Sequence, residues 1–233
     1  MFPWLYAIPI AFLAGTIPFG LLIGRAKGVD VRKVGSGNIG ATNLGRVLGT
    51  PYFFLCFALD FLKGFGPVLA TGWLAGLLAP QQLSGLEAWL WVTAMLAPVL
   101  GHVLNPWLKF KGGKGVATSL GALVAVWPHL TVPALGALAV FLVVLGVGRY
   151  MSLASVSAGM SLPVFVEGLW LWRSQHKPFD IDAPPASVSE IAPFLVVSGA
   201  IAILVIWTHR ANIKRLQMGT EPKFGARTPP KSL

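Results

Sequence analysis

Three short segments of the chain combine glycine, hydroxyl, amide and basic side chains in patterns that suit phosphate binding. The first reads GSGNIGATNLGR (residues 35–46), the second contains FKGGKGVAT (110–118), and the third reads HRANIKR (209–215) followed by GTE (219–221). Glycines allow backbone N–H groups to surround an anion, and a helix that begins directly after them adds the positive end of its dipole. The three segments therefore predict a site for phosphate groups.

The first two segments carry the candidate phosphate ligands. Arg46 supplies a planar guanidinium that is always charged, and Lys114 stands directly before an apolar run that is expected to be helical. Neutral polar side chains and the backbone N–H groups of glycines around these two cations are the remaining candidate ligands. We predict that phosphate is bound by Gly35, Gly37, Asn38, Gly40, Thr42, Asn43, Arg46, Lys111, Gly112, Gly113 and Lys114.

Both glycine-rich segments resemble nucleotide-binding patterns, but neither satisfies one. The first six residues of the first segment match G-x-G-x-x-G, yet no strand pattern precedes them and no strand–helix–strand unit surrounds them. In the second segment Leu108 stands where a Walker A loop needs its first glycine, and Gly115 stands where it needs Ser or Thr. A nucleotide-binding fold is therefore disfavoured.

The composition indicates an integral membrane protein. Of the 233 residues, 55% are hydrophobic and only 11% are charged, and the mean hydropathy is +0.72. Soluble domains carry about 25% charged residues. We expect an all-α, polytopic membrane protein that forms a single domain over residues 1–233.

Apolar runs predict seven transmembrane helices. A helix needs about 20 residues to cross a bilayer, and the fourth run is short by that measure. The sequence Trp127-Pro-His-Leu130 separates the fourth run from the fifth and favours a tight turn there. The predicted spans are residues 2–24, 51–78, 86–104, 116–127, 130–147, 153–172 and 191–208.

The basic residues predict the orientation of these spans. Fifteen of the 18 Lys and Arg residues fall on one side of the expected topology: in the loops 25–46 and 109–114, at Arg149 and in the tail after Thr208. Cytoplasmic loops carry the excess of Lys and Arg in membrane proteins. We therefore expect the N-terminus outside, the C-terminus in the cytoplasm and all three polar segments on the cytoplasmic face. The net charge of +10 then reflects this rule and not nucleic-acid binding.

The first two segments contain a short internal similarity. Residues 41–45 read ATNLG and residues 117–121 read ATSLG, each after a glycine-rich stretch. The similarity has two interpretations: small residues that start a helix, or two phosphate-binding seats of the same construction. A reaction between two phosphorylated substrates would use two such seats.

A few polar residues in or next to the spans have ordinary structural interpretations. Asp60 and Lys63 are three residues apart in the second span and so share a helix face, and we favour a structural ion pair over a catalytic role. We interpret His102 as a residue that caps the third span. The lone Cys56 excludes an intrachain disulfide. The basic residues expected to be interfacial anchors are Lys109, Lys214 and Arg215.

The three segments resemble the three cytoplasmic motifs of the bacterial acyl-phosphate:glycerol-3-phosphate acyltransferase family. The resemblance implies a multi-pass enzyme of the bacterial plasma (inner) membrane that begins phospholipid synthesis. It would acylate position 1 of glycerol 3-phosphate with acyl phosphate, giving lysophosphatidic acid and phosphate. One departure is visible: Asn105 occupies the position where the family usually has proline, and Pro106 follows it.

The resemblance also implies roles for individual residues. Ser36 matches a serine essential in the family, Arg46 and Lys114 match basic residues of the first two motifs, and the third motif contributes His209, Asn212 and Glu221. We accordingly predict Ser36, His209, Asn212 and Glu221 as the catalytic group. His209, Glu221 or the donor's own phosphate could accept the proton, and the sequence leaves these alternatives open.

Acyl phosphate is already an activated mixed anhydride, which favours a simple mechanism. A serine ester would be a poorer acyl donor than the anhydride it replaced, so an acyl-enzyme brings no advantage. We expect direct transfer, with Ser36 orienting the substrate and the protein holding two anions side by side.

The expected partners are the substrates acyl phosphate and glycerol 3-phosphate and the lipid bilayer, with no nucleic acid. The enzyme that supplies acyl phosphate is a further partner to consider. We expect no cofactor and no metal, because no cluster of carboxylates and histidines is visible.

The alternative function is a membrane transporter of a phosphorylated solute, which would show polar groups near the middle of several spans. The H-x-x-x-x-D motif of other acyltransferases is absent.

Overall fold

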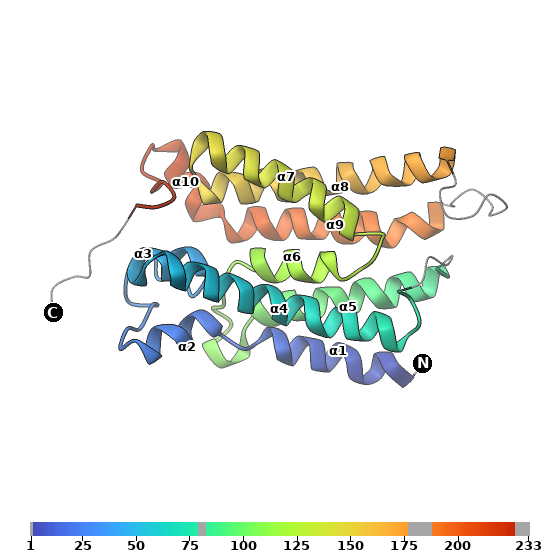
Figure 1. Ribbon diagram of the computed structural model, residues 1–233, viewed down its shortest axis with the longest axis horizontal. Helices are drawn as coiled ribbons and strands as arrows, with labels where there is room; N and C mark the ends of the chain where they lie inside the picture. Colours follow the sequence, from blue (N-terminus) through green and yellow to red (C-terminus); the bar gives the residue numbers. More distant parts are fainter. Residues whose placement is uncertain (1, 79–82, 177–187, 227–233) are drawn as a thin grey trace.

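The computed structural model describes residues 2–78, 83–176 and 188–226, which form an elongated bundle of helices without any strand in these ranges (Figure 1). The first helix starts at one end of the bundle, and the last short helix lies at the other end (Figure 1). The elements are α1 (Phe2–Gly15), α2 (Phe19–Ala26), α3 (Ala41–Leu48), α4 (Thr50–Leu74), α5 (Gly85–Val103), the 3-10 turn η1 (Pro106–Leu108), α6 (Val116–Val124), α7 (Thr131–Gly148), α8 (Met151–His176), α9 (Val188–Thr208) and α10 (Arg210–Gln217).

Six helical segments in the described part of the chain are long and apolar enough to cross a membrane. They correspond to six of the seven predicted spans, with bounds that differ by only a few residues. The fourth predicted span, 116–127, corresponds to α6, which has only nine residues. At about 1.5 Å per residue, α6 covers less than half of a hydrocarbon core of about 30 Å. The all-α membrane fold is therefore confirmed, whereas the count of seven spans and the orientation of the termini stay predictions.

The first predicted span is interrupted where we expected one continuous helix. Helix α1 ends at Gly15 and α2 begins at Phe19, directly after Pro18. Proline lacks an N–H donor and disfavours the helical conformation of the residue before it. The break leaves backbone carbonyls without helical partners at membrane depth, where each needs another donor.

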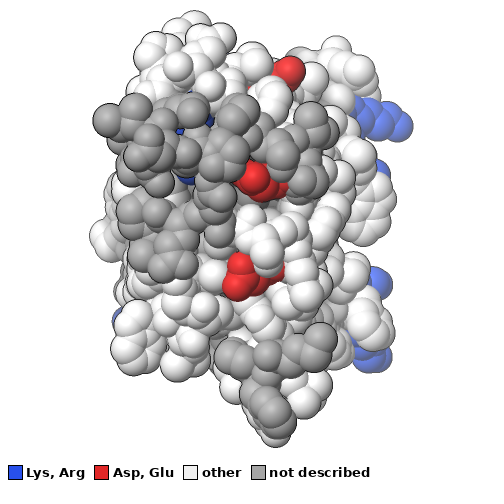
Figure 2. All heavy atoms as spheres, turned by 90° about the vertical axis from the view of Figure 1, so that its right-hand side faces the viewer, with Lys and Arg blue, Asp and Glu red and all other residues white. Residues whose placement is uncertain are grey.

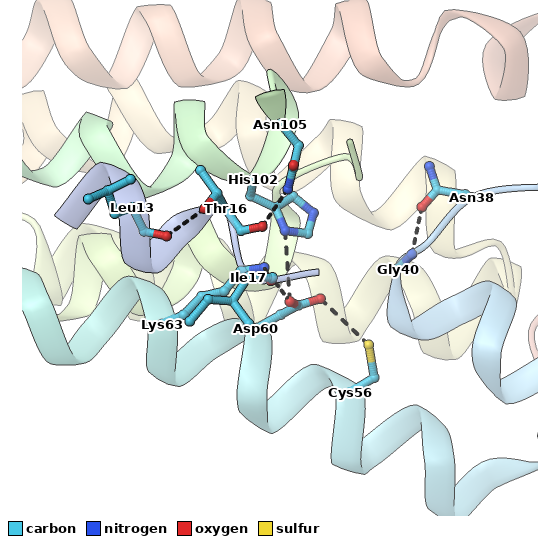
Figure 3. A network of polar contacts seen from close by, with 10 residues as sticks. All are labelled: Leu13, Thr16, Ile17, Asn38, Gly40, Cys56, Asp60, Lys63, His102 and Asn105. Carbon is cyan, nitrogen blue, oxygen red and sulfur yellow. Dashed lines mark hydrogen bonds and ion pairs between the residues drawn. The ribbon is translucent and has the colours of Figure 1, made fainter. Parts of the chain in front are cut away.

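Two side chains from other helices satisfy the carbonyls at this break. Lys63 Nζ of α4 donates a hydrogen bond to the Ile17 carbonyl at 2.7 Å. Asn105 Nδ2, just beyond α5, donates one to the Thr16 carbonyl at 2.6 Å (Figure 3). Asn105, the residue that departs from the family pattern, therefore caps the break through its side chain. A proline at this position would have no such donor.

Helix α6 packs closely against α4 because both helices carry a glycine at the contact. A Cβ atom on Gly64 would lie 2.2 Å from the Thr118 carbonyl oxygen, and one on Gly121 would lie 2.1 Å from that of Phe61. Small residues allow membrane helices to approach in this way. The short α6 is thus held inside the bundle, with its first residues directed to the end where α3 and α10 lie (Figure 1).

The opposite end of the bundle carries acidic and uncharged side chains. Figure 2 shows acidic groups near the centre of this face and Lys and Arg mostly at its margin. Glu87 and Glu190 lie in the first turns of α5 and α9, which begin at this end (Figure 1). The basic loops 25–46 and 109–114 lie at the other end, beside the starts of α3 and α6.

Candidate functional site

One cavity of about 330 Å³ brings the three polar segments together. It lies at the end of the bundle where α3, α6 and α10 begin, and its lining continues between α4, α7 and α8. Ten of the predicted site residues line it, from all three segments: Ser36, Asn38, Gly40, Thr42, Asn43, Arg46, Lys114, His209, Asn212 and Glu221.

Three helices begin at this cavity. The lining includes Ala41 at the start of α3, Val116 at the start of α6 and Arg210 at the start of α10. The first N–H groups of a helix have no partner within the helix, and the dipole makes this end positive. The ends of α3 and α6 therefore favour an anion in the cavity, whereas a single residue, His209, separates the end of α9 from the start of α10, so the negative end of α9 offsets the positive end of α10. The sequence predicted the first two, and the third is a finding of the structure.

The loop of the first segment is organised by the side chain of Asn43. The side chain is buried, and its Oδ1 accepts a hydrogen bond from the backbone N–H of Ser36 at 2.8 Å. Its Nδ2 donates to the carbonyls of Val31, Val34 and Asn38 at 2.9 to 3.2 Å. We predicted Asn43 as a phosphate ligand, but its amide is already occupied in shaping the loop.

The second and third segments are joined by a chain of hydrogen bonds. Lys114 Nζ donates to Asn212 Oδ1 at 2.6 Å, and Asn212 Nδ2 donates to Glu221 Oε1 at 2.7 Å. Ser152 of α8 donates to the same carboxylate oxygen at 2.8 Å, while Arg215 Nε donates to Oε2 at 2.7 Å. The ammonium group of Lys114 is therefore held in place at the cavity.

Burial changes the acidity of the cationic ligands. Lys114 is partly buried, and this burial lowers its pKa to about 8 despite the opposing charge of Glu221. Burial also lowers the pKa of Arg46, whose Nη2 donates to the Pro222 carbonyl at 3.3 Å. Cations that are poorly solvated and only partly neutralised favour an incoming anion, because the anion restores the lost solvation.

His209 and Glu221 differ in their capacity to accept a proton. His209 Nδ1 lies 2.8 Å from the Val205 carbonyl, so Nδ1 carries the hydrogen and Nε2 keeps a lone pair. Burial, aided by the charge of Lys114, lowers the pKa of His209 to about 4. Burial acts to raise the pKa of Glu221, but hydrogen bonds from Asn212, Ser152 and Arg215 outweigh it and hold that pKa below its ordinary value. Glu221 is thus an anchored carboxylate.

Comparison with known proteins decides the family. Residues 5–219 match the sequence profile described as "Glycerol-3-phosphate acyltransferase". The chain belongs to the glycerol-3-phosphate acyltransferase family. Among curated members of that name, the Trichlorobacter lovleyi protein is 42% identical over 222 residues, which cover 95% of this chain and 98% of the relative. The Aquifex aeolicus protein is 43% identical, over 94% of this chain and 98% of the relative.

The fold agrees with a crystal structure from the same family. The structure titled PlsY (YgiH), an integral membrane glycerol 3-phosphate acyltransferase in its glycerol 3-phosphate form, superposes with a TM-score of 0.76 at 39% identity, over 95% of this chain and 96% of that chain. Its lysophosphatidic acid form gives a TM-score of 0.74 at 38% identity, over 96% of each chain.

Five of the residues that we predicted as phosphate ligands do not line the cavity. Lys111 is exposed and does not reach the cavity. The others are glycines that shape the loops: Gly35 and Gly37 adopt φ angles of 60° and 70°, a left-handed conformation that favours glycine. Gly112 and Gly113 bond to carbonyls at the end of α5. Their contribution is to the backbone and not to the lining.

Several other residues that line the cavity were not predicted as site residues, and four of them bear on its chemistry. Arg215, expected as an interfacial anchor, instead pairs with Glu221 and lines the cavity. Ser152 lies in an apolar helix outside every motif, so no sequence signal indicated it. Asp60 forms the predicted ion pair with Lys63 at 2.7 Å, yet it also lines the cavity, as does His102. The described residues contain no cluster of His, Cys, Asp and Glu suited to a metal ion.

Proposed function

We propose that this chain transfers an acyl group from acyl phosphate to position 1 of glycerol 3-phosphate, giving lysophosphatidic acid and phosphate. The observation that carries this proposal is the cavity where three helix N-termini and the cations Arg46, Lys114 and Arg215 meet. Family membership supplies the acyl transfer to glycerol 3-phosphate. The related crystal structures, titled as glycerol 3-phosphate and lysophosphatidic acid forms, support the same substrate and product.

The cavity suits two anions that react with each other. Both substrates carry a phosphate group, and their mutual repulsion must be offset before the glycerol hydroxyl can approach the acyl carbonyl. Positive helix ends and buried cations provide this compensation in a poorly hydrated place, where it is strongest. The apolar side of the lining, which includes Phe57 and Phe141, suits the acyl chain.

The transfer is direct in this proposal. The glycerol oxygen bonds to the acyl carbon as the bond from that carbon to the phosphate oxygen breaks. The hydroxyl proton passes to the departing phosphate. Glu221 is occupied by three donors, and His209, with a pKa of about 4, is a weaker base than a phosphate dianion, whose conjugate acid has a pKa of about 6. Ser36, exposed at the cavity, orients the substrate.

An assay of the purified full chain tests this function. Glycerol 3-phosphate is supplied with acyl phosphate in one sample and with acyl-CoA in a parallel sample. Formation of lysophosphatidic acid from acyl phosphate alone is the expected result. Intact-protein mass spectrometry after rapid mixing with acyl phosphate, without glycerol 3-phosphate, should show no added acyl group. An acylated Ser36 that turns over at the catalytic rate would replace direct transfer by a covalent mechanism.

We also propose that the site faces the cytoplasm in a bacterial inner membrane, with the acyl-phosphate-supplying enzyme as a neighbour. The loops 25–46 and 109–114 and the tail after Thr208 hold most of the Lys and Arg residues. Because they lie at the α10 end, they support this orientation. Single cysteines at Lys33, Lys111 and Met218, all exposed positions, test it in a Cys56→Ala background. A membrane-impermeant reagent should label them in inverted vesicles and leave them unlabelled in right-side-out vesicles. The reverse pattern would place the site outside.

A further inference from the structure

A buried ion pair adjoins the cavity inside the membrane-spanning part of the bundle. Lys63 Nζ lies 2.7 Å from Asp60 Oδ1, and the two side chains are only 2% and 4% exposed. Cys56 Sγ donates to the other carboxylate oxygen at 3.6 Å, and Figure 3 shows His102 directed toward the same group. A buried ion pair is often no more stable than apolar residues of similar volume. Stability alone therefore gives no reason for a carboxylate here.

The Asp60 carboxylate faces one side of the His102 ring, and the second glycine-rich segment covers the other. His102 Nδ1 lies 3.8 Å from Asp60 Oδ1. A Cβ atom on Gly113 would lie only 2.0 Å from His102 Nε2, so the backbone of Gly113 packs directly on the ring. This separation is too long for a hydrogen bond, and His102 Nδ1 has no hydrogen-bond partner among the described residues. The carboxylate therefore acts on the orientation of the imidazole through its charge alone.

The backbone of His102 holds the same segment. The Gly113 N–H donates to the His102 carbonyl at 3.2 Å, and the Gly112 N–H donates to the Val103 carbonyl at 3.1 Å. A Cβ atom on Gly112 would lie 1.9 Å from the His102 carbonyl oxygen. No side chain separates the segment from the end of α5, so the position of the His102 ring bears directly on the glycine backbone.

Lys114 follows Gly113 directly and must point into the cavity. Its Nζ meets Asn212 Oδ1 at 2.6 Å, a contact between segments almost a hundred residues apart. A misplacement of about 1 Å can cost roughly a hundredfold in rate. The position of this ammonium group therefore depends on how firmly the two preceding glycines are held.

We infer that Asp60 is a positioning residue for phosphate binding. Asp60 holds the His102 ring, and this ring together with the backbone carbonyl of His102 fixes Gly112 and Gly113. These two glycines direct Lys114 into the cavity. Lys63 neutralises the carboxylate and ties α4 to the α1–α2 break through the Ile17 carbonyl. This inference rests on the proposed function for the identity of the phosphate ligand. It gives the ion pair a role in substrate binding that a purely structural pair would not have.

The decisive variant is the neutral double substitution Asp60→Asn/Lys63→Gln. It leaves no uncompensated charge, and the glutamine keeps a donor for the Ile17 carbonyl. KM and kcat of the purified full chain are measured for each substrate, with Lys114→Gln identifying the substrate that Lys114 binds. We expect at least a tenfold rise in KM for that substrate and less than a threefold fall in kcat. His102→Gln should give the same combination of a raised KM and a nearly unchanged kcat. Combining it with the double variant should raise KM little further.

Thr71→Val is the matched control, because Thr71 is also a buried polar residue of α4. Among the described residues its side chain bonds only to its own helix, at the Pro67 carbonyl. Its KM values should stay within twofold of wild type. A wild-type KM in the neutral double variant would show that Asp60 merely compensates Lys63 and would overturn the inference. Fully additive effects of Asp60 and His102 would overturn it as well.

Two provisions keep the test decisive. If the Asp60 variants are not recovered as folded protein, His102→Gln decides alone, and a normal KM in that variant overturns the inference. If the wild-type chain does not acylate glycerol 3-phosphate, the proposed function fails. The rise in thermal unfolding midpoint caused by inorganic phosphate then replaces KM. That rise should be lost in the double variant and kept in Thr71→Val, and its persistence in both would overturn the inference.

Discussion

The two glycine-rich segments reach the same cavity by different constructions. In the first, the buried amide of Asn43 bonds four backbone groups and so defines the loop from inside. In the second, bare glycine backbone lies against the end of α5, and the carbonyls of His102 and Val103 hold it. One loop depends on the presence of a side chain, and the other on the absence of two. Substitutions should therefore damage them in opposite ways.

The largest effect is expected at the cation of the second segment. Lys114→Gln should lower kcat/KM by a hundredfold or more, because loss of one partner of a desolvated charge pair costs roughly 2–5 kcal/mol. Lys111→Gln is the control, since Lys111 is exposed and away from the cavity; we expect less than a threefold change. Steady-state kinetics with both substrates measure this. Equal losses in the two folded variants would contradict the assignment of Lys114 to the site.

The next effect tests the bare backbone of the second segment. Gly113→Ala adds a Cβ atom only 2.0 Å from His102 Nε2, so the segment must shift, and we expect a ten- to hundredfold loss of kcat/KM. Gly219→Ala is the control, because nothing lies within 4 Å of a Cβ there; its φ of +70°, unlike the φ of Gly113, adds backbone strain to this variant. If Gly219→Ala is the more damaging of the two, close packing on His102 is not what the second segment requires.

The first segment should respond to loss of a side chain. Asn43→Ala leaves one N–H and several carbonyls of the loop without their partner, and each buried unsatisfied group costs about 1–3 kcal/mol. We expect about a tenfold loss of kcat/KM together with a lower thermal unfolding midpoint. Asn38→Ala removes only the bond to the Gly40 N–H at 2.8 Å and should lower the midpoint less. A variant at Asn43 with unchanged stability would show that the loop is held by other contacts.

The pH dependence of binding should also distinguish the segments. Burial lowers the pKa of Lys114 to about 8, so the fraction of charged lysine falls as the pH rises through 8, and the affinity for phosphate falls with it. KM should rise up to tenfold per pH unit above that value. In Lys114→Arg the cation stays charged, and this rise should vanish. A rise that persists in Lys114→Arg would trace the titration to a different group.

The smallest effect concerns the internal similarity between residues 41–45 and 117–121. Thr42 lines the cavity, whereas Thr118 is fully buried and its Oγ1 has no partner among the described residues. Thr118→Val should leave activity within twofold, because it removes only a buried hydroxyl. Thr42→Val should raise KM several-fold. Equal kinetic effects would support two seats of the same construction, which the present geometry disfavours.

The sequence determined the properties that depend on composition and on local backbone chemistry. The shortage of charge and the apolar runs predicted an all-α membrane protein, and glycine-rich stretches before helices predicted anion seats. These features are local, because a helix N-terminus or a left-handed glycine is specified by neighbours in the chain. Arg46, Lys114, His209 and Asn212 could be identified for the same reason, since each stands inside a recognisable motif.

Only the tertiary structure decided how these pieces act together. The spacing of residues in the sequence could not show that the Asn43 amide bonds its own loop or that Lys111 lies outside the cavity lining. Nor could it show that Arg215 pairs with Glu221 and lines the cavity. The break after Gly15 is stabilised because Lys63 of α4 and Asn105, just beyond α5, donate hydrogen bonds to its free carbonyls. Such contacts join residues far apart in sequence, and their geometry is set by the packing of α4, α5 and α6. That packing placed Asp60 and His102 at the cavity, a position that no local pattern could have revealed.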